Sequence, residues 1–363
     1  MGEGGSVCGD SGESMALAVQ RDLTAVSSGI AGWLAAHRDV DDLTVTRCER
    51  PSGGLSSETL MLGATGTRGG GEHSESLVVR LAPSGAGIFP EYDLAVQARA
   101  QEVAAAHGVP AAVPVELETD AQWLGAPFLV MPAIEGHIPG PMPLRDAWVN
   151  ESIESSNAVS RRVYEVLAAI HRIDWRAAGL DHVIPVRGVD AELAYWTRYL
   201  EWYADGGRPA AVLHDGLAWC VANRPAGEPP HAFLWGDVRL GNIIFADDRR
   251  PVAVLDWEMT TIGAPEHDLA WYLTLEATQN ELFGRRVPGF LDHDEACEYY
   301  ESLVGRPLQS LAWFEVLAMV RSTAIMTRLA YVQEQDGVTP MLPVADNPLL
   351  DLLSRRITEA GGR

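Results

Sequence analysis

The residue pattern of this 363-residue chain changes near position 157. Before that point, short apolar runs separated by turn residues predict strands, and after it apolar residues recur at helical spacing. The expected strands are 44–47, 58–62, 76–81, 113–117 and 127–134, with a glycine-rich loop at 65–75 and one inserted helix at 92–107. The expected later helices are 158–173, 188–204, 209–223, 265–281, 294–304, 308–335 and 347–360. This order predicts a two-lobed α+β protein.

The boundaries of the two lobes follow from composition. Residues 1–14 are rich in glycine, serine and acid and predict a disordered tail, and residues 15–41 contain a predicted helix at 17–37. The predicted N-lobe, 42–134, has a five-stranded antiparallel sheet plus one helix. Glycine and proline in 135–143 indicate a hinge or linker, and 144–363 form a mainly helical C-lobe whose one hairpin is expected at 243–255.

The charge balance excludes several classes of function. The net charge of −23 argues against a nucleic-acid partner, because phosphate binding needs a basic face. All 27 basic residues are arginine, which excludes a lysine Schiff base and a lysine-containing phosphate loop. No apolar run approaches the ~20 residues of a membrane span, and no leader pattern is visible, so we expect a cytoplasmic protein. The sequence gives no indication of oligomeric state.

One short segment carries most of the chemistry. Asn242 precedes an apolar run, a polar turn follows, and a second apolar run ends at Asp256. Pairing the two runs as an antiparallel hairpin makes Asn242 and Asp256 neighbours. A carboxylate beside an amide oxygen suits Mg²⁺, which prefers oxygen ligands and keeps its other positions for water or phosphate. The sequence therefore predicts Asn242 and Asp256 as metal ligands.

A third side chain lies just upstream of this hairpin. Asp237 precedes Asn242 by five residues, the spacing that separates the base of a kinase catalytic loop from its metal-binding Asn. Arg239 would direct a permanent positive charge at a transferring phosphoryl group. Together these residues favour an ATP- and Mg²⁺-dependent phosphotransferase with Asp237 and Arg239 in catalytic roles.

The runs GDVRLGNIIF and VAVLDWEMTTIGAPEHDLAW resemble the catalytic region of the aminoglycoside phosphotransferase family, within the protein-kinase-like superfamily. More narrowly, they are similar to phosphotransferase domains found alone in actinobacteria or fused to acyl-CoA dehydrogenases. The similarity spans roughly residues 42–335. It implies a bilobal protein-kinase-like fold with ATP between the lobes, Asp237 as catalytic base and Asp268 as a structural acid behind the metal loop.

The same resemblance implies nucleotide contacts in the N-lobe. Arg80 stands in place of the family's phosphate-holding lysine, and Gln97 in place of the helix glutamate that tethers it. A guanidinium keeps the charge and can reach two phosphate oxygens, although Gln97 gives a weaker tether. The remaining expected contacts are the phosphate-covering turn at Ser52, Gly53, Gly54 and Ser56, and an adenine edge at Met131, Pro132 and Ile134, where the Pro132 carbonyl accepts and the Ile134 N–H donates.

Three aromatic or histidine features have structural interpretations. Trp235 stands where the family has a histidine, and its ring could brace the loop by packing. We expect His171 to be a helix histidine behind the catalytic loop. The aromatic residues on the helix at 188–204 recur at helical spacing and are expected in the core: Tyr195, Trp196, Tyr199, Trp202 and Tyr203.

The phosphate acceptor is expected to be a small hydroxylated molecule. An acidic surface would attract an aminoglycoside-like cation, whereas the resemblance to the dehydrogenase-associated branch points to a hydroxy acid or its CoA ester. One alternative is a catalytically weak pseudokinase or nucleotide-binding regulator, suggested by Trp235, Arg80 and Gln97. A second is a metal-dependent hydrolase that uses Asp237, Asp256 and His267.

Overall fold

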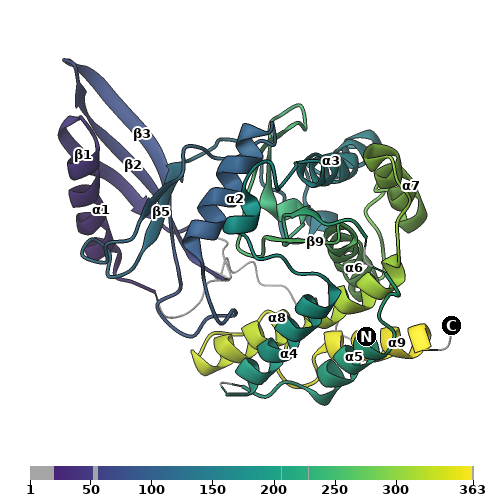
Figure 1. Cartoon of the computed structure of the whole chain (residues 1–363). Coiled ribbons are helices and arrows are strands. Elements are labelled where there is room, and N and C mark those ends of the chain that lie inside the picture. Colours follow the sequence, from purple (N-terminus) through teal and green to yellow (C-terminus); the bar gives the residue numbers. More distant parts are fainter. Residues whose placement is uncertain (1–19, 52–55, 206, 228, 362–363) are drawn as a thin grey trace, which may run out of the picture.

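The computed structural model describes residues 20–51, 56–205, 207–227 and 229–361. Figure 1 shows a β-rich part, coloured purple and blue, beside a mainly helical part that continues to the C-terminus. The predicted two-lobed α+β architecture is therefore confirmed. The predicted tail at 1–14 and the turn residues Ser52, Gly53 and Gly54 lie outside the described residues.

The N-lobe is built on one sheet. Its strands are β1 (Asp41–Glu49), β2 (Glu58–Arg68), β3 (Gly71–Leu81), β4 (Glu116–Glu118) and β5 (Phe128–Pro132). Their order is β1-β2-β3-β5-β4, and every neighbouring pair is antiparallel. The prediction of a five-stranded antiparallel sheet is confirmed.

The prediction of a loop at 65–75 is wrong. β2 and β3 pair without interruption from Glu58 opposite Leu81 to Arg68 opposite Gly71. Only Gly69 and Gly70 form the turn, with φ of 59° and 82°. A two-residue hairpin needs left-handed backbone at its tip, which two glycines supply without a steric cost. The polar residues on either side belong to the exposed end of a long hairpin.

Two helices cover the sheet on opposite faces. α1 (Leu23–His37) packs on the face that includes Leu77, Val79 and Leu81, whereas α2 (Leu94–Ala106) packs on the face that includes Val78. This alternation follows from the two-residue period of a strand. α1 begins later than the predicted 17–37, because the Asp22 side chain accepts a hydrogen bond from the Ala25 N–H (2.9 Å) and caps the helix there.

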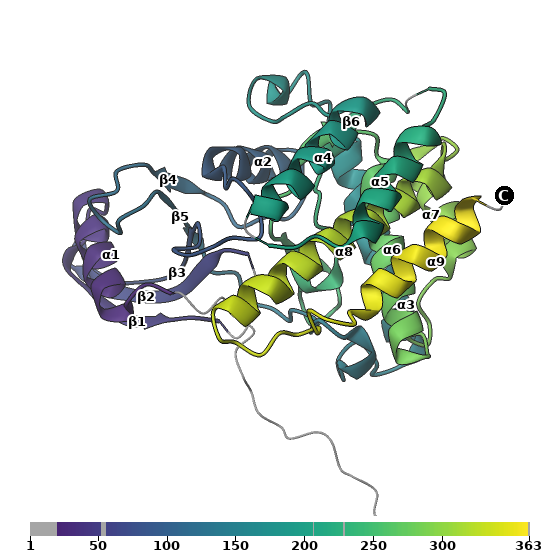
Figure 2. The ribbon, with the colours of Figure 1, turned by 90° about the horizontal axis from the view of Figure 1, so that it is seen from below.

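The C-lobe is mainly helical. Its helices are α3 (Ile153–His171), α4 (Val189–Asp205), α5 (Ala211–Ala222), α6 (Glu266–Phe283), α7 (His293–Val304), α8 (Leu311–Gln335) and α9 (Pro348–Gly361). Figure 2 shows α5 and α8 beside the C-terminal α9. On α4, the side chains of Trp196, Tyr199 and Tyr203 are buried, which confirms the core interpretation of the aromatic stripe. No helix of the described ranges is both long and apolar enough to span a bilayer.

Two short antiparallel strand pairs lie within and at the ends of the segment 232–263, which contains the predicted catalytic motif. β7 (Ile243–Phe245) pairs with β8 (Pro251–Val254), with Ile243 opposite Val254, which confirms the predicted hairpin. β6 (Ala232–Leu234) pairs with β9 (Thr261–Gly263) and was not predicted. A strand of three residues is too short to show an apolar periodicity in the sequence. This second pair holds both ends of the segment 235–260 in place.

α3 and α6 share an acid that gives the fold a pH dependence. Glu276 on α6 accepts hydrogen bonds from the hydroxyls of Tyr272 (3.0 Å) and Tyr164 (3.5 Å). Burial raises the pKa of Glu276 to about 7. The folded state therefore keeps a proton that the unfolded chain, with an ordinary carboxyl pKa near 4.3, releases. The free energy of unfolding then falls as the pH rises from about 4.5 to 7.

We expect Glu276→Gln to remove this loss of stability. The side chain is half-buried, so at about pH 8 the variant should be more stable than the unchanged protein by about 1–2 kcal/mol, part of the ~3 kcal/mol that such a shift represents. The difference should shrink toward pH 5, where both side chains are neutral in the folded state. Urea unfolding at the two pH values measures it. Equal stability at pH 8 would contradict the assigned protonation.

Candidate active site

The loop between β6 and β7 brings the predicted catalytic-loop residues together. The Asn242 side-chain amide donates to the Asp237 carbonyl (3.0 Å) and to Asp237 Oδ2 (2.8 Å). Arg239 Nε donates to the same carboxylate oxygen (3.0 Å). The Asp237 side chain is 14 % exposed. A carboxylate held by two donors therefore lies at the surface of this loop, at the five-residue spacing read from the sequence.

A fourth residue of this cluster was missed. The indole Nε1 of Trp271 donates to Asp237 Oδ1 (3.2 Å). Donors thus approach both oxygens of Asp237, which fixes the rotation of the carboxylate. Trp271 lies on α6 three residues after Asp268, so it occupies the same helix face as the structural acid. The three-residue spacing from Asp268 was the feature of the sequence that placed Trp271 on the same side of the helix as the loop.

The loop is anchored from behind by Asp268. Its carboxylate accepts hydrogen bonds from the backbone N–H groups of Trp235 (2.7 Å) and Gly236 (3.0 Å), and His171 Nε2 lies 3.1 Å from Oδ2. The side chains of His171 and Asp268 are each 2 % exposed. His171 also contacts the Tyr300 hydroxyl (2.6 Å). These contacts confirm that His171 is a helix histidine that supports the loop from behind. Asp268 likewise lies behind the loop, as the resemblance implied.

Trp235 links this loop to the hairpin. Its side chain is fully buried, and its Nε1 donates to the Leu255 carbonyl (2.8 Å). The ring packs beside Trp257, with centroids 6.4 Å apart. The indole therefore braces the loop both by packing and by a hydrogen bond to the residue before Asp256.

Asp256 follows β8 and lies next to Asn242 along the hairpin. The Leu255 N–H donates to the Asn242 carbonyl (2.8 Å), and Asp256 has a left-handed φ of 61°. The charges of both carboxylates act on Arg239. Burial lowers the pKa of Arg239, but the negative charges of Asp237 and Asp256 outweigh burial and raise that pKa above its ordinary value. Asp256 therefore lies one residue beyond the partner of Asn242 in the hairpin, and close enough to the loop for its charge to act on Arg239 together with that of Asp237.

The donor set of this site fits Mg²⁺. Asn242 uses its amide nitrogen for Asp237, which leaves its side-chain oxygen, together with the Asp256 carboxylate, for a cation. No group of three or more His, Cys, Asp or Glu side chains able to hold a metal occurs in the described part of the chain. Mg²⁺ needs no such cage, because it commonly binds through one or two protein oxygens plus phosphate and water.

The ligand set of the hydrolase alternative is not assembled. His267 is buried on α6, where its Nδ1 contacts Arg321 and its Nε2 lies 3.3 Å from Glu192. The Trp196 indole also donates to Glu192 (2.6 Å). His267 therefore belongs to a buried ion network between α4, α6 and α8, with its hydrogen-bonding groups turned to Glu192 and Arg321.

The N-lobe reaches this site through Arg80. Its Nη2 donates to Asp256 Oδ1 (2.5 Å) and to Glu258 Oε2 (2.9 Å). The expected hydrogen bond from Arg80 to Gln97 is not formed: the Gln97 oxygen is buried without a partner among the residues that the structure describes. The sequence prediction was wrong on this contact, because the C-lobe supplies two carboxylates that attract a guanidinium more strongly than a neutral amide does.

Glu258 is a second residue that the sequence prediction missed. Its side chain is 5 % exposed and accepts a hydrogen bond from the Ser57 hydroxyl (3.1 Å). Burial and the neighbouring Asp256 raise the pKa of Glu258 to about 7, while Arg80 and Ser56 act in the opposite direction. Ser56, predicted in the phosphate-covering turn, is thus turned toward a carboxylate.

The end of β5 has backbone groups that face away from β3. Pro132 lies opposite Leu77, and the Ala133 N–H donates to the Ser76 carbonyl (2.9 Å). In an antiparallel ladder the backbone groups of alternate residues point to opposite sides, so the Pro132 carbonyl and the Ile134 N–H face away from β3. The missing N–H of proline costs nothing there. Met131, the residue before, is buried.

Comparison with known proteins decides the family. The model of the phosphotransferase enzyme family matches residues 47–302, more than half of the chain. The chain belongs to the phosphotransferase enzyme family. The resemblance read from the runs at 236–245 and 252–271 is thereby confirmed, and the match includes both lobes.

Among curated relatives of this chain, acyl-CoA dehydrogenase family member 11 of Mus musculus is 30 % identical over 200 residues, covering 54 % of this chain and 25 % of the relative. The chain thus spans about a quarter of that relative's length. A crystal structure of a candidate aminoglycoside phosphotransferase from Ralstonia eutropha JMP134 is 21 % identical, with a TM-score of 0.69, and covers 92 % of this chain and 98 % of its own.

A further structural neighbour of this chain is a thermostable mutant of aminoglycoside phosphotransferase APH(4)-Ia, crystallised with AMP-PNP and hygromycin B. It is 12 % identical, with a TM-score of 0.57, and covers 93 % of this chain and all of its own. Both structural similarities show a shared fold.

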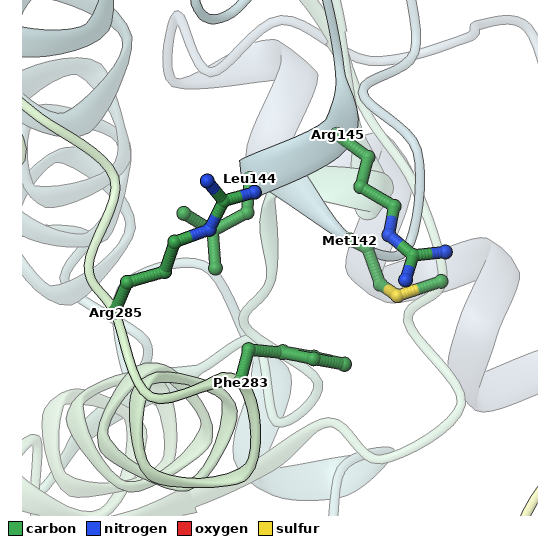
Figure 3. A pocket seen from close by; sticks show the side chains of 5 residues that line it. All are labelled: Met142, Leu144, Arg145, Phe283 and Arg285. Atoms are coloured by element: carbon green, nitrogen blue, oxygen red, sulfur yellow. The ribbon is translucent and has the colours of Figure 1, made fainter. Parts of the chain in front are cut away.

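A hollow of about 160 Å³ lies elsewhere on this chain. Figure 3 shows its lining side chains, which are Met142, Leu144, Arg145, Phe283 and Arg285. Phe283 ends α6, twelve residues after Trp271, so the two lie roughly 18 Å apart along the helix. The hollow contains none of the residues that surround Asp237.

Proposed function

We propose that this protein transfers the terminal phosphoryl group of ATP to a hydroxyl of a small molecule. The observation that carries the proposal is the convergence of three C-lobe residues, Asp237, Asn242 and Asp256, where an N-lobe arginine, Arg80, reaches across to Asp256 (2.5 Å). A phosphotransferase needs this combination of a carboxylate, oxygen ligands and cations, because its catalysis is mainly positioning and charge neutralisation.

Asp237 is the residue that binds the acceptor hydroxyl and takes its proton. Its carboxylate orientation is fixed by Arg239, Asn242 and Trp271, and its partly exposed edge is available to accept a hydrogen bond from substrate. The acceptor oxygen forms a bond to phosphorus as the bond between phosphorus and ADP breaks, and the hydroxyl proton passes to Asp237. Arg239, whose guanidinium is fixed beside Asp237, stabilises the charge of the transferring group.

Asn242 and Asp256 are the residues that would hold Mg²⁺. The cation supplies neutralisation of phosphate charge. Arg80 adds a second positive charge from the N-lobe, and the absence of lysine from the chain leaves arginine to do this. The Pro132 carbonyl and the Ile134 N–H offer an acceptor and a donor suited to the adenine edge, beside the buried Met131.

The acceptor is a hydroxy acid or its CoA ester. The similarity to acyl-CoA dehydrogenase family member 11 supports this class. The alternative is an aminoglycoside, since a neighbour of the same fold is crystallised with hygromycin B and the net charge of −23 would attract a polycation. Rapid phosphorylation of kanamycin-type drugs with a micromolar KM would overturn the hydroxy-acid assignment.

A panel of acceptors tests the proposal. Purified protein is incubated with ATP, Mg²⁺ and either hydroxy acids, their CoA esters or aminoglycosides, and ADP release is measured with and without EDTA. We expect metal-dependent ADP release with one acceptor class.

The competing pseudokinase function is favoured by the contact between Arg80 and Asp256, because Arg80 occupies an oxygen of a proposed metal ligand. It predicts thermal stabilisation by ATP without ADP release from any acceptor.

A further inference from the structure

The tether of Arg80 is not on α2. Gln97 Oε1 and Arg80 Nε are both buried without a hydrogen-bond partner in the described residues. A bond between them would have satisfied both groups, and unsatisfied buried polar atoms are uncommon. The N-lobe helix therefore does not hold the arginine that faces the proposed phosphate site.

The C-lobe holds Arg80 instead. Its Nη2 lies 2.9 Å from Glu258 Oε2 and 2.5 Å from Asp256 Oδ1. Burial lowers the pKa of Arg80, but the two carboxylates outweigh burial and raise it above its ordinary value. The guanidinium is thus a paired, permanently charged group whose position is set by two residues of the segment 256–258.

Glu258 is itself held firmly. The preceding residue, Trp257, stacks on Phe233 with ring centroids 5.6 Å apart and donates its Nε1 to the Val254 carbonyl (3.2 Å). The Ser57 hydroxyl donates to the same Glu258 oxygen that Arg80 contacts (3.1 Å). One buried carboxylate oxygen of the C-lobe therefore meets side chains from the start of β2 and from β3.

We propose that Glu258 is the positioning residue for Arg80, in place of the α2 residue at position 97. This inference rests on the proposed function, in which Arg80 neutralises phosphate. Asp256 is the proposed cation ligand, so its oxygens are shared, whereas Glu258 keeps its contact with Arg80. Because Glu258 lies on the C-lobe, the tether also joins the two lobes, and losing it weakens nucleotide binding.

Glu258→Gln tests the proposal, since it keeps the shape of the side chain and replaces the carboxylate that Arg80 contacts with an amide that cannot carry a negative charge. The dissociation constant of AMP-PNP with Mg²⁺, measured by calorimetry, should rise about tenfold. The KM for ATP should rise with it while the KM for the acceptor stays constant, a split that a general loss of folding would not produce. The double variant Arg80→Ala with Glu258→Gln should bind no more weakly than Arg80→Ala alone, because the two residues act as a unit.

Glu276→Gln is the matched control, since it makes the same substitution at an acid whose contacts are Tyr164 and Tyr272 rather than Arg80, and it should bind AMP-PNP within about twofold of the unchanged protein. Unaltered affinity in Glu258→Gln, or a larger loss in Gln97→Ala than in Glu258→Gln, would overturn the assignment of Glu258. Additive losses in the double variant would do the same. Failure of the unchanged protein to bind AMP-PNP would instead overturn the proposed function together with this inference.

Discussion

Asp237→Ala should abolish phosphoryl transfer and leave nucleotide binding nearly intact. The substitution removes the carboxylate that Arg239, Asn242 and Trp271 jointly orient, and with it the group that would take the acceptor proton. A positioned base contributes about 10²–10⁴-fold to rate, so kcat should fall by roughly 10³-fold. The affinity for AMP-PNP should change little, because Arg80 and Asp256 are untouched. Steady-state ADP release and calorimetry measure the two effects.

Asp237→Asn separates chemistry from structure in the same experiment. An amide oxygen at position 237 still accepts the Arg239 and Asn242 hydrogen bonds, and the bond from the Trp271 indole is lost because an amide nitrogen cannot accept it. Two of the three contacts of the loop are thus kept, but an amide cannot act as the base. Both variants should unfold at temperatures near that of the unchanged protein. Turnover within tenfold of the unchanged protein in either variant would reject Asp237 as the base.

Gly236→Ala should be the most destabilising single-methyl change in the catalytic loop. Gly236 has a φ of 95°, and an added Cβ would lie 2.2 Å from the Met259 carbonyl oxygen. That neighbour is backbone, so it can yield only if the segment after Asp256 moves. Left-handed strain and the overlap together should cost on the order of 3–4 kcal/mol of unfolding free energy. Activity should fall as well, because the Gly236 N–H is bonded to Asp268.

The chain offers a matched control at another left-handed glycine. Gly284 ends α6 with a φ of 65°, and no atom lies within 4 Å of an added Cβ. Gly284→Ala should therefore cost about 1 kcal/mol, from backbone strain alone. Denaturant unfolding of both variants compares the two costs. Equal losses would show that the approach of Met259 to Gly236 does not constrain the loop.

The local parts of the site could be predicted from the sequence. A strand, a polar turn and a second strand in direct succession can pair in few ways, so the hairpin at 243–254 followed from the sequence. The register sets Asn242 opposite Leu255, one residue before Asp256. The contact of Asp237 with Asn242 followed from a five-residue spacing within one loop. The lobe order likewise followed from the change of apolar period near residue 157, because strands and helices have different periods.

The partners of Arg80 could not be predicted in this way. Arg80 and Glu258 are separated by 178 positions along the chain, and no local pattern indicates which distant acid a cation will meet. The same holds for Trp271, whose indole reaches Asp237 only because α6 packs behind the catalytic loop. The β6–β9 pair was missed for a related reason, since strands of three residues are defined by their partner rather than by their own pattern.

Taken alone, the sequence determined which residues are neighbours within a loop or hairpin, because chain connectivity and backbone period limit those distances. The tertiary structure alone decided which lobe holds Arg80 and which side chains orient Asp237. Those contacts depend on how separate elements pack, and burial makes them selective: a guanidinium removed from water pairs with the nearest carboxylate rather than with a neutral amide.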